Sequence, residues 1–186
     1  MLYILSGVAK SGKSYVAGRL LEDRRIANFS TDYLMMALGT GNPSLDIDVN
    51  GDDRDVAKAL EPYLHSMISC MIQNQENYLI EGVHFNPDFM YSLLQEFPDR
   101  IRAVYLIYEE AAEEQKAEEI RKYCIEGKTC WLSDYTDKQL LELIVYLKQV
   151  SSRLKKECTD YGIPYYEVKD ICEDYSNITD ILMRDA

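Results

Sequence analysis

The chain has 186 residues and a mass of 21.5 kDa, which is about the size of one domain. Its hydrophobic fraction of 47% and charged fraction of 28% are those of an ordinary globular protein, and they exclude a disordered chain or a fibre. The net charge of −12 repels phosphate backbones at long range, so we expect no nucleic-acid partner and no binding to anionic membranes.

Insertion into a membrane and oxidative cross-linking are also disfavoured. No apolar run approaches the ~20 residues that span a bilayer, and the apolar run at residues 1–6 is too short for a signal peptide. The five cysteines are odd in number and form no C-x-x-C pair, so we expect neither a disulfide framework nor a zinc ribbon. We expect a cytoplasmic protein that is a monomer or a homodimer.

The chain begins with alternating strand and helix patterns. Residues 2–5 form an apolar run rich in strand formers, and Gly7 ends it. The apolar spacing from Lys13 to Arg24 is helical, and residues 26–30 predict a second strand, which is short. This order is typical of the start of an α/β domain.

A stretch without periodicity follows. Residues 39–53 carry Gly, Asn, Pro and Asp and predict a loop or a small lid-like insertion. Thr31 or Asp32 is suited to cap the helix that precedes this stretch. The helical spacing after it, from 56 to 71, contains Pro62, which must either begin that helix or kink it.

The second half of the chain repeats the alternation. In chain order it predicts a strand at 78–80, a helix at 87–97, a strand at 101–108, a charged helix at 109–123, a long amphipathic helix at 140–161, a strand at 163–168 and a helix at 175–183. The run at 101–108 is apolar almost throughout, as in a strand buried within a parallel sheet. Five alternations of strand and helix predict a three-layer α/β domain with a parallel sheet.

One motif carries a specific chemistry. The pattern G-x-x-x-x-G-K-[ST] is matched at every fixed position by Gly7-Val8-Ala9-Lys10-Ser11-Gly12-Lys13-Ser14. It follows the first strand and opens the first helix, where a phosphate-binding loop uses the N–H groups of a helix N-terminus. The two glycines allow the loop to turn its N–H groups toward phosphate oxygens. The motif therefore predicts a site for nucleotide phosphates.

Three of the loop's side chains have expected roles of their own. Lys13 supplies a positive charge to the β- and γ-phosphates, and the Ser14 hydroxyl is placed to ligate Mg²⁺. Lys10 has two open interpretations, because a lysine at this position either approaches the phosphates or lies in solvent.

Polar residues also follow the second and third predicted strands. The carboxyl ends of parallel strands form the ligand crevice of such sheets. Glu81 is therefore a candidate to orient a Mg²⁺-bound water, the alternative being a strand-end carboxylate that faces water. Asp32 is a candidate to accept a proton from an acceptor hydroxyl or to orient it, the alternative being a helix cap.

Three further residues are candidates for contact with the acceptor. Gly82 and His84 follow Glu81 at the expected crevice, where His84 either binds an acceptor oxyanion or is structural. Arg54 either faces an anionic substrate or is a solvated charge. Cations that converge on residues 39–53 and Arg54 would indicate an anionic acceptor.

The segments GVAKSGKS, STDYLMMALG and LIEGVHF, in this order, resemble the P-loop small-molecule kinases of the nucleoside-monophosphate-kinase type, and locally most resemble 2-phosphoglycerate-kinase-like proteins. The resemblance covers roughly residues 1–110. It implies one P-loop kinase domain over 1–186, with a five-stranded parallel sheet in the order 2-3-1-4-5 and helices on both faces. It also implies ATP with Mg²⁺ as cofactors, and transfer of the γ-phosphoryl group to a hydroxyl or phosphate of a small metabolite.

The same resemblance implies a substrate-side insertion at 39–75 and a helical lid at 109–133. Lids of this family carry several arginines that clamp the transferring phosphoryl group, whereas the cations of 109–128 are only Lys116, Arg121, Lys122 and Lys128. Arg121 is the candidate clamp, the alternative being a helical ion pair with an acid such as Glu118.

Two other functions stay open. A lid poor in arginine favours a regulatory ATP-binding switch without a small-molecule acceptor, and a toxin-type kinase of a nucleotide sugar would share the phosphate loop. A GTPase is disfavoured, because the chain has no N-K-x-D signature and no D-x-x-G after the third predicted strand.

Overall fold

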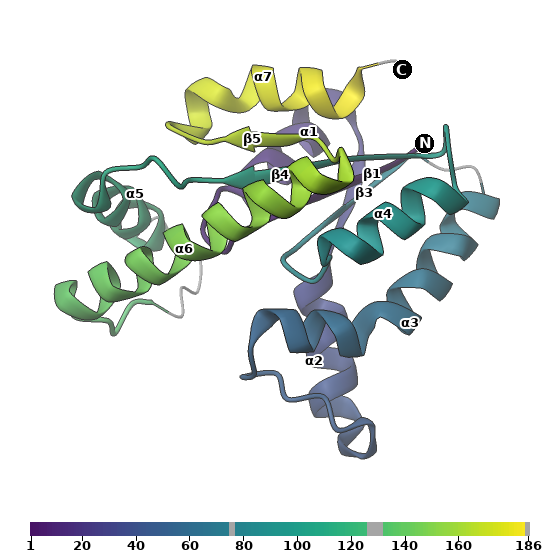
Figure 1. Cartoon of the computed structure of the whole chain (residues 1–186), viewed down its shortest axis with the longest axis horizontal. Helices are drawn as coiled ribbons and strands as arrows, with labels where there is room; N and C mark the ends of the chain where they lie inside the picture. The colour runs from purple at the N-terminus through teal and green to yellow at the C-terminus, as the bar shows by residue number, and fades with distance from the viewer. Residues whose placement is uncertain (75–76, 126–131, 185–186) are drawn as a thin grey trace.

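The computed structural model describes residues 1–74, 77–125 and 132–184. Five parallel strands form one sheet in the order β2-β3-β1-β4-β5, with helices on both faces (Figure 1). The strands are β1 (Leu2–Gly7), β2 (Ala27–Ser30), β3 (Tyr78–Glu81), β4 (Ile101–Ile107) and β5 (Tyr165–Glu167). The predicted α/β class, parallel sheet and strand order are confirmed.

Two hydrophobic cores lie on the two faces of the sheet. Helices α1 (Lys13–Arg24) and α7 (Ile171–Met183) cover one face, and α3 (Asp53–Gln73), α4 (Pro87–Glu96) and α6 (Asp137–Tyr161) pack against the other. Successive strand residues point to opposite faces, so within β1 Ile4 enters one core and Leu5 the other. Both side chains are fully buried, as expected for a parallel sheet covered on both sides.

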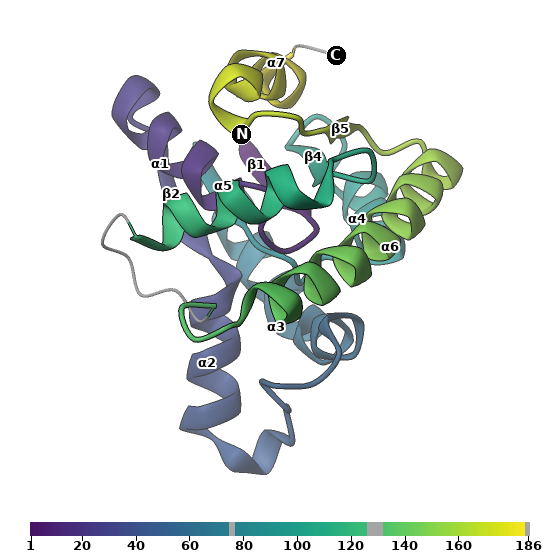
Figure 2. The same ribbon diagram turned by 90° about the vertical axis from the view of Figure 1, so that its left-hand side faces the viewer.

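Two helices lie at the periphery. Helix α2 (Thr31–Gly41) projects away from the sheet toward the short 3₁₀ turn η1 (Pro43–Leu45) (Figure 1). Helix α5 (Glu113–Ile125) lies beside the beginning of α6 (Figure 2), and the two share a small core of their own that includes Ile120 and Ile144.

Helix boundaries differ from the expectation at two caps. Ser30, and not Thr31 or Asp32, caps α2, because the Ser30 hydroxyl oxygen accepts a hydrogen bond from the Asp32 N–H at 3.4 Å. Helix α7 begins four residues before its predicted start. Its cap is Asp170, whose carboxylate accepts from the N–H groups of Cys172 and Glu173. This cap extends the predicted helix by four residues at its beginning.

Helix α3 contains Pro62 in its interior. The helix begins nine residues earlier at Asp53, where the Asp52 carboxylate accepts a hydrogen bond from the Arg54 N–H at 2.9 Å. The alternative in which Pro62 begins the helix is therefore wrong.

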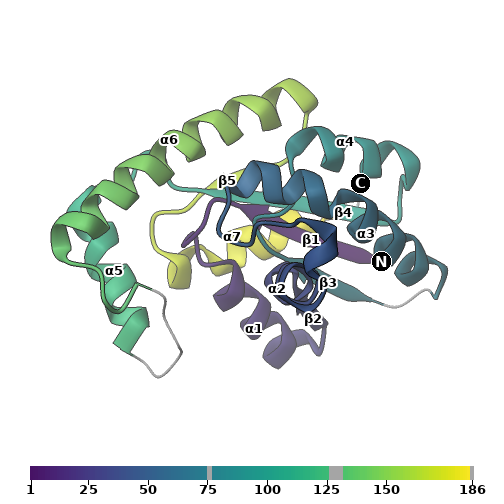
Figure 3. The same cartoon turned by 90° about the horizontal axis from the view of Figure 1, so that it is seen from below.

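The register of the sheet determines which residues meet at its carboxyl edge. Glu81 at the end of β3 pairs with Leu5 of β1 on one side and with Ser30 of β2 on the other. The segments that follow β1, β2 and β3 therefore leave the sheet side by side (Figure 3). None of the described helices is long and apolar enough to cross a membrane.

Candidate functional site

The segment between β1 and α1 is a tight loop that only glycine can begin. Gly7 has φ +124°, and a Cβ there would lie 2.1 Å from the carbonyl oxygen of Leu106. The loop is held internally, since the Ser11 hydroxyl donates to the Val8 carbonyl oxygen at 2.8 Å. Gly12 caps α1 with φ +94° and no side-chain acceptor, so the first N–H groups of α1 have no side-chain cap. Such a helix N-terminus suits an anion.

Lys13 lies folded into this loop. Its side chain is buried, and its ammonium group donates to the carbonyl oxygen of Val8 at 2.7 Å and to that of Gly7 at 3.4 Å. Burial lowers the pKa of Lys13 to about 8, although the carboxylates of Glu81 and Asp32 oppose this shift. The amine is thus held at the loop by weak neutral acceptors that phosphate oxygens can replace.

Ser14 and Glu81 are brought together as expected. The Ser14 hydroxyl donates to the Glu81 carboxylate at 3.3 Å, and Glu81 is buried at the end of β3. Mg²⁺ prefers oxygen ligands and is commonly held by one or two protein groups together with phosphates and water. This pair fits such an ion, and no group of three or more His, Cys, Asp or Glu side chains within the described ranges forms a separate metal site.

Thr31 and His84 join the ends of β2 and β3. The Thr31 hydroxyl and His84 Nδ1 are 2.7 Å apart, and both side chains are buried. Burial lowers the pKa of His84, with Asp32 opposing this shift and Lys13 adding to it. A Cβ on Gly82 would lie 1.8 Å from the Thr31 hydroxyl oxygen. His84 is therefore a neutral group that fixes this junction, and its Nδ1 is engaged.

Asp32 lies at the same junction but is open to solvent. Its side chain is 65% exposed, and its carboxylate is 3.8 Å from His84 Nδ1. Lys10 is half-buried with φ +61°. Burial lowers the pKa of Lys10, and the negative charge of Asp32 opposes this. Lys10 is thus partly withdrawn from solvent on the side of the loop that faces Asp32.

Arg121 is engaged away from the loop. Its guanidinium donates to the carbonyl oxygens of Leu132 and Tyr135 and pairs with Asp137 at 3.3 Å. These contacts tie α5 to the beginning of α6, and they replace the expected alternative of an ion pair with Glu118. Lys122 is exposed, and Lys128 lies outside the described residues.

Another cation of α5 lies near the loop. The Lys116 ammonium is buried 4.5 Å from the centre of the Tyr108 ring and 2.9 Å from the Glu119 carboxylate. The Tyr108 hydroxyl in turn donates to the Ala9 carbonyl oxygen of the loop at 3.1 Å. Burial lowers the pKa of Lys116. Its sequence context, a lysine among glutamates, gave no signal for this placement.

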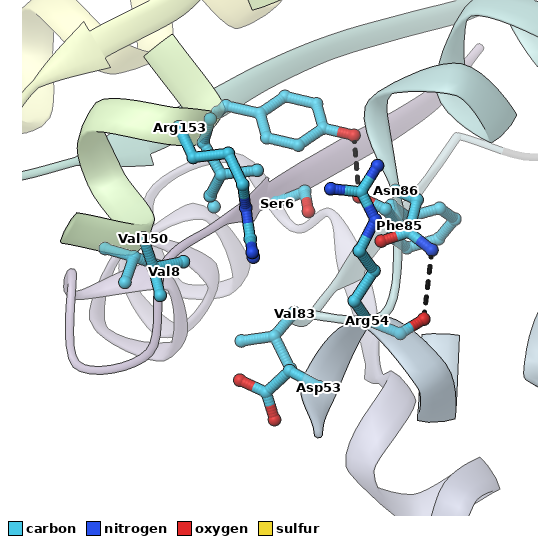
Figure 4. A pocket seen from close by; sticks show the side chains of 12 residues that line it. Ser6, Val8, Asp53, Arg54, Val83, Phe85, Asn86, Val150 and Arg153 are labelled. Atoms are coloured by element: carbon cyan, nitrogen blue, oxygen red, sulfur yellow. Dashed lines mark hydrogen bonds between the residues drawn. The ribbon is translucent and has the colours of Figure 1, made fainter. Parts of the chain in front are cut away.

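A cavity opens beside the loop (Figure 4). Gly7 and Val8 border it on one side, Asp53 and Arg54 reach it from the start of α3, and Arg153 reaches it from α6. The structure thus brings the expected Arg54 to a cavity that the loop also lines. Asp53 and Arg153 were not predicted, because neither belongs to a motif and their meeting depends on how α3 and α6 pack on the sheet.

No family model matches the chain, and no curated protein matches its sequence. Solved structures match it in fold. A shikimate kinase from Bacteroides thetaiotaomicron is 12% identical, with a TM-score of 0.62 over 98% of both chains. An uncharacterized protein from Eubacterium ventriosum is 13% identical, with a TM-score of 0.55 over 98% of this chain and 97% of that one. Shikimate kinase from Acinetobacter baumannii in complex with shikimate is 14% identical, with a TM-score of 0.51 over 98% of this chain and 92% of that one. The chain has the fold of P-loop kinases.

Proposed function

We propose that the protein is an ATP-dependent phosphotransferase that moves the γ-phosphoryl group to a hydroxyl or a phosphate of a small metabolite. The observation that carries this proposal is the phosphate loop, with its uncapped helix N-terminus, beside the Ser14–Glu81 pair. The proposal treats residues 1–186 as one kinase domain, with an acceptor-side insertion at 39–75 and a lid at 109–133.

Each group of the site has a part in this proposal. Loop N–H groups and Lys13 hold the phosphates, and Ser14 with Glu81 holds Mg²⁺, which when bound neutralises charge on the phosphates. Asp32 orients the attacking hydroxyl. In-line phosphoryl transfer requires little covalent chemistry from the protein, so positioning and electrostatic stabilisation supply the rate.

The test is a transfer assay with Mg·ATP and a panel of acceptors. The panel contains nucleosides, sugars and hydroxy acids. It includes shikimate, which occupies a structural neighbour, and 2-phosphoglycerate, chosen for the local sequence resemblance. We expect ADP release that depends on one acceptor class and is lost in Lys13→Ala. A wild-type protein that binds no nucleotide would refute the proposal.

A regulatory ATP-binding switch is the second candidate, and the engagement of Arg121 favours it. An arginine held by Leu132, Tyr135 and Asp137 must leave these partners before it can reach a phosphoryl group. Under this alternative, ATP binds and no acceptor in the panel is phosphorylated. Arg121→Gln would then leave ATP affinity unchanged and lower only the thermal stability, because the residue acts as a tie between α5 and α6.

A further inference from the structure

The cavity beside the phosphate loop has a charge pattern that the loop does not explain. Two arginines and one aspartate line it, although they come from helices far apart in the sequence (Figure 4). It adjoins the loop at Gly7 and Val8, so a molecule in it would lie next to phosphates held by the loop. The cavity is thus placed to hold the second substrate of a phosphoryl transfer.

Arg153 supplies the first part of the argument. Within the part of the chain that the structure describes, its guanidinium makes no hydrogen bond and no ion pair, although it lines the cavity. A guanidinium is always charged and presents several donors in a planar fork that matches carboxylate or phosphate. The protein as a whole carries a charge of −12, so a cation without an ion pair in a concave site is a local exception that favours an anion.

Arg54 adds a second cation whose position is fixed. Its guanidinium pairs with Glu157 of α6 at 2.8 Å, and its backbone carbonyl oxygen accepts a hydrogen bond from the Asn86 side chain at 3.1 Å. These contacts hold the start of α3 against α6 and the segment after β3. The two arginines therefore extend toward one cavity from two helices (Figure 4).

Asp53 places a negative charge in the cavity, opposite to the charge of the two arginines. It lines the same space, and its pKa is raised by burial, while the charges of Lys13 and Arg153 act in the other direction. A carboxylate accepts hydrogen bonds, so a molecule beside it must present a donor such as a hydroxyl group. A purely anionic ligand would satisfy the arginines and be repelled by Asp53, and a neutral polyol would offer no charge opposite to that of Arg153.

We propose that this cavity is the acceptor site and that the acceptor is a small hydroxy acid with more than one hydroxyl. Its anionic group lies on Arg153 and Arg54 and one hydroxyl faces Asp53, while the attacking hydroxyl is the one that Asp32 orients. This inference rests on the proposed phosphotransferase function. It assigns specificity to Arg153 and a hydroxyl contact to Asp53. In the reaction, the acceptor oxygen forms a bond to the γ-phosphorus as the bond to the β,γ-bridging oxygen of ATP breaks, ADP leaves, and the hydroxyl proton passes to a carboxylate or to solvent.

The anion site is tested with inorganic phosphate as the probe, on protein saturated with Mg·AMP-PNP so that the loop is filled. Calorimetry should show saturable phosphate binding that is weakened about tenfold or more in Arg153→Gln, the loss expected for a charged hydrogen-bonding partner. Lys156→Gln removes the same charge from the next turn of α6, outside the cavity, and should keep wild-type affinity. Absence of saturable binding, or equal losses in both variants, would overturn the proposal.

The role of Asp53 predicts that its substitution affects phosphate binding and phosphoryl transfer in opposite directions. Asp53→Asn removes a negative charge from the cavity, so phosphate should bind as well as in the wild type or more tightly. Transfer to a hydroxy acid should nevertheless fall, by about tenfold or more in kcat/KM. Asp55→Asn, on the same helical turn and outside the cavity, is the control. If Asp53→Asn weakens phosphate binding, or if transfer is unchanged, the assignment of Asp53 is wrong.

A paired substrate assay separates this inference from the proposed function. Shikimate and its neutral methyl ester keep the same hydroxyls and differ in the charged group. Transfer to acids over their neutral partners, lost in Arg153→Gln, supports the acceptor site. Transfer to neutral partners at equal rates refutes the hydroxy-acid inference and leaves the phosphotransferase intact. A failure to bind a fluorescent ATP analogue refutes the phosphotransferase itself.

Discussion

Lys13 shows how much of the site's behaviour depends on the burial of a single amine. The side chain donates to carbonyl oxygens of its own loop and is shielded from water, and burial lowers its pKa to about 8. A lysine with this pKa exchanges its proton within the pH range in which enzymes are commonly assayed. Bound phosphates carry several negative charges and favour the protonated form, so nucleotide binding and protonation of Lys13 are linked.

The linkage predicts the pH dependence of nucleotide affinity. Below about pH 8 the free protein already carries the proton, and protonation of Lys13 should add no pH dependence to the Kd for ADP. Above this pH the free protein has lost the proton and binding must take it up, so Kd should rise by up to about tenfold per pH unit. Titrations with a fluorescent ADP analogue at about pH 7, 8 and 9 measure this. Lys13→Gln should bind more weakly with no such rise, and parallel profiles for the two proteins would contradict the prediction.

At the scale of the element, two of the three glycines in the strand-to-helix unit of β1 and α1, Gly7 and Gly18, have opposite requirements. Gly7 lies at a positive φ against the backbone of β4, whereas Gly18 lies within α1, where a methyl group in place of its hydrogen would have nothing within 4 Å. The first glycine is required by close packing of backbone on backbone. The second only weakens the helix, because glycine loses more conformational freedom on folding than alanine does.

Alanine substitutions at these two positions should therefore shift stability in opposite directions. Gly7→Ala is expected to destabilise the fold by about 3 kcal/mol or more, since the backbone of Leu106 cannot move aside. Gly18→Ala is expected to stabilise it by about 0.5–1 kcal/mol. Urea unfolding followed by circular dichroism measures both. If Gly7→Ala left the free energy of unfolding unchanged, the loop would have to relax away from β4.

The sequence predicted those parts of the site that are contiguous or lie at strand ends. The loop from Gly7 to Ser14 is one motif, and the approach of Glu81 to Ser14 follows from the rule that parallel strands end at one edge of the sheet. Asp53 and Arg153 could not be predicted in this way. Their positions depend on the rotation of α3 and α6 about their axes, which is set by core packing and not by any local pattern.

Arg121 illustrates the same limit in the other direction. The family resemblance suggested a clamp, and the contacts that Arg121 makes belong to a turn whose conformation no local pattern revealed. The expected ion-pair partner was one helical turn away, and the actual partner, Asp137, is 16 residues further along the chain. Short-range spacing rules describe helix surfaces well and do not describe how two helices meet.

The whole molecule carries a charge of −12, while both proposed substrates are anions. At low ionic strength the field of the protein extends tens of ångströms and repels such ligands before they reach the loop. Salt screens this repulsion over long distances and leaves contacts inside the cavity less affected.

The rate of nucleotide association should therefore increase with salt, contrary to the usual behaviour of a charged ligand meeting a complementary surface. Stopped-flow fluorescence with an ATP analogue, from about 10 to about 150 mM salt at constant free Mg²⁺, measures the association rate. A rate that falls over this range would mean that local cations around the loop outweigh the overall charge.

Helix α6 connects the contact with α5 to the cavity beside the loop. It has 25 residues, or roughly 37 Å at 1.5 Å per residue. At its beginning Asp137 forms the ion pair with Arg121 of α5. About four turns later, Arg153 of the same helix lines the cavity. One helix that packs against the sheet thus carries both the ion-pair partner of Arg121 and the guanidinium that lines the cavity. A displacement of α5 that carried α6 with it would also shift Arg153 relative to the second substrate that we propose.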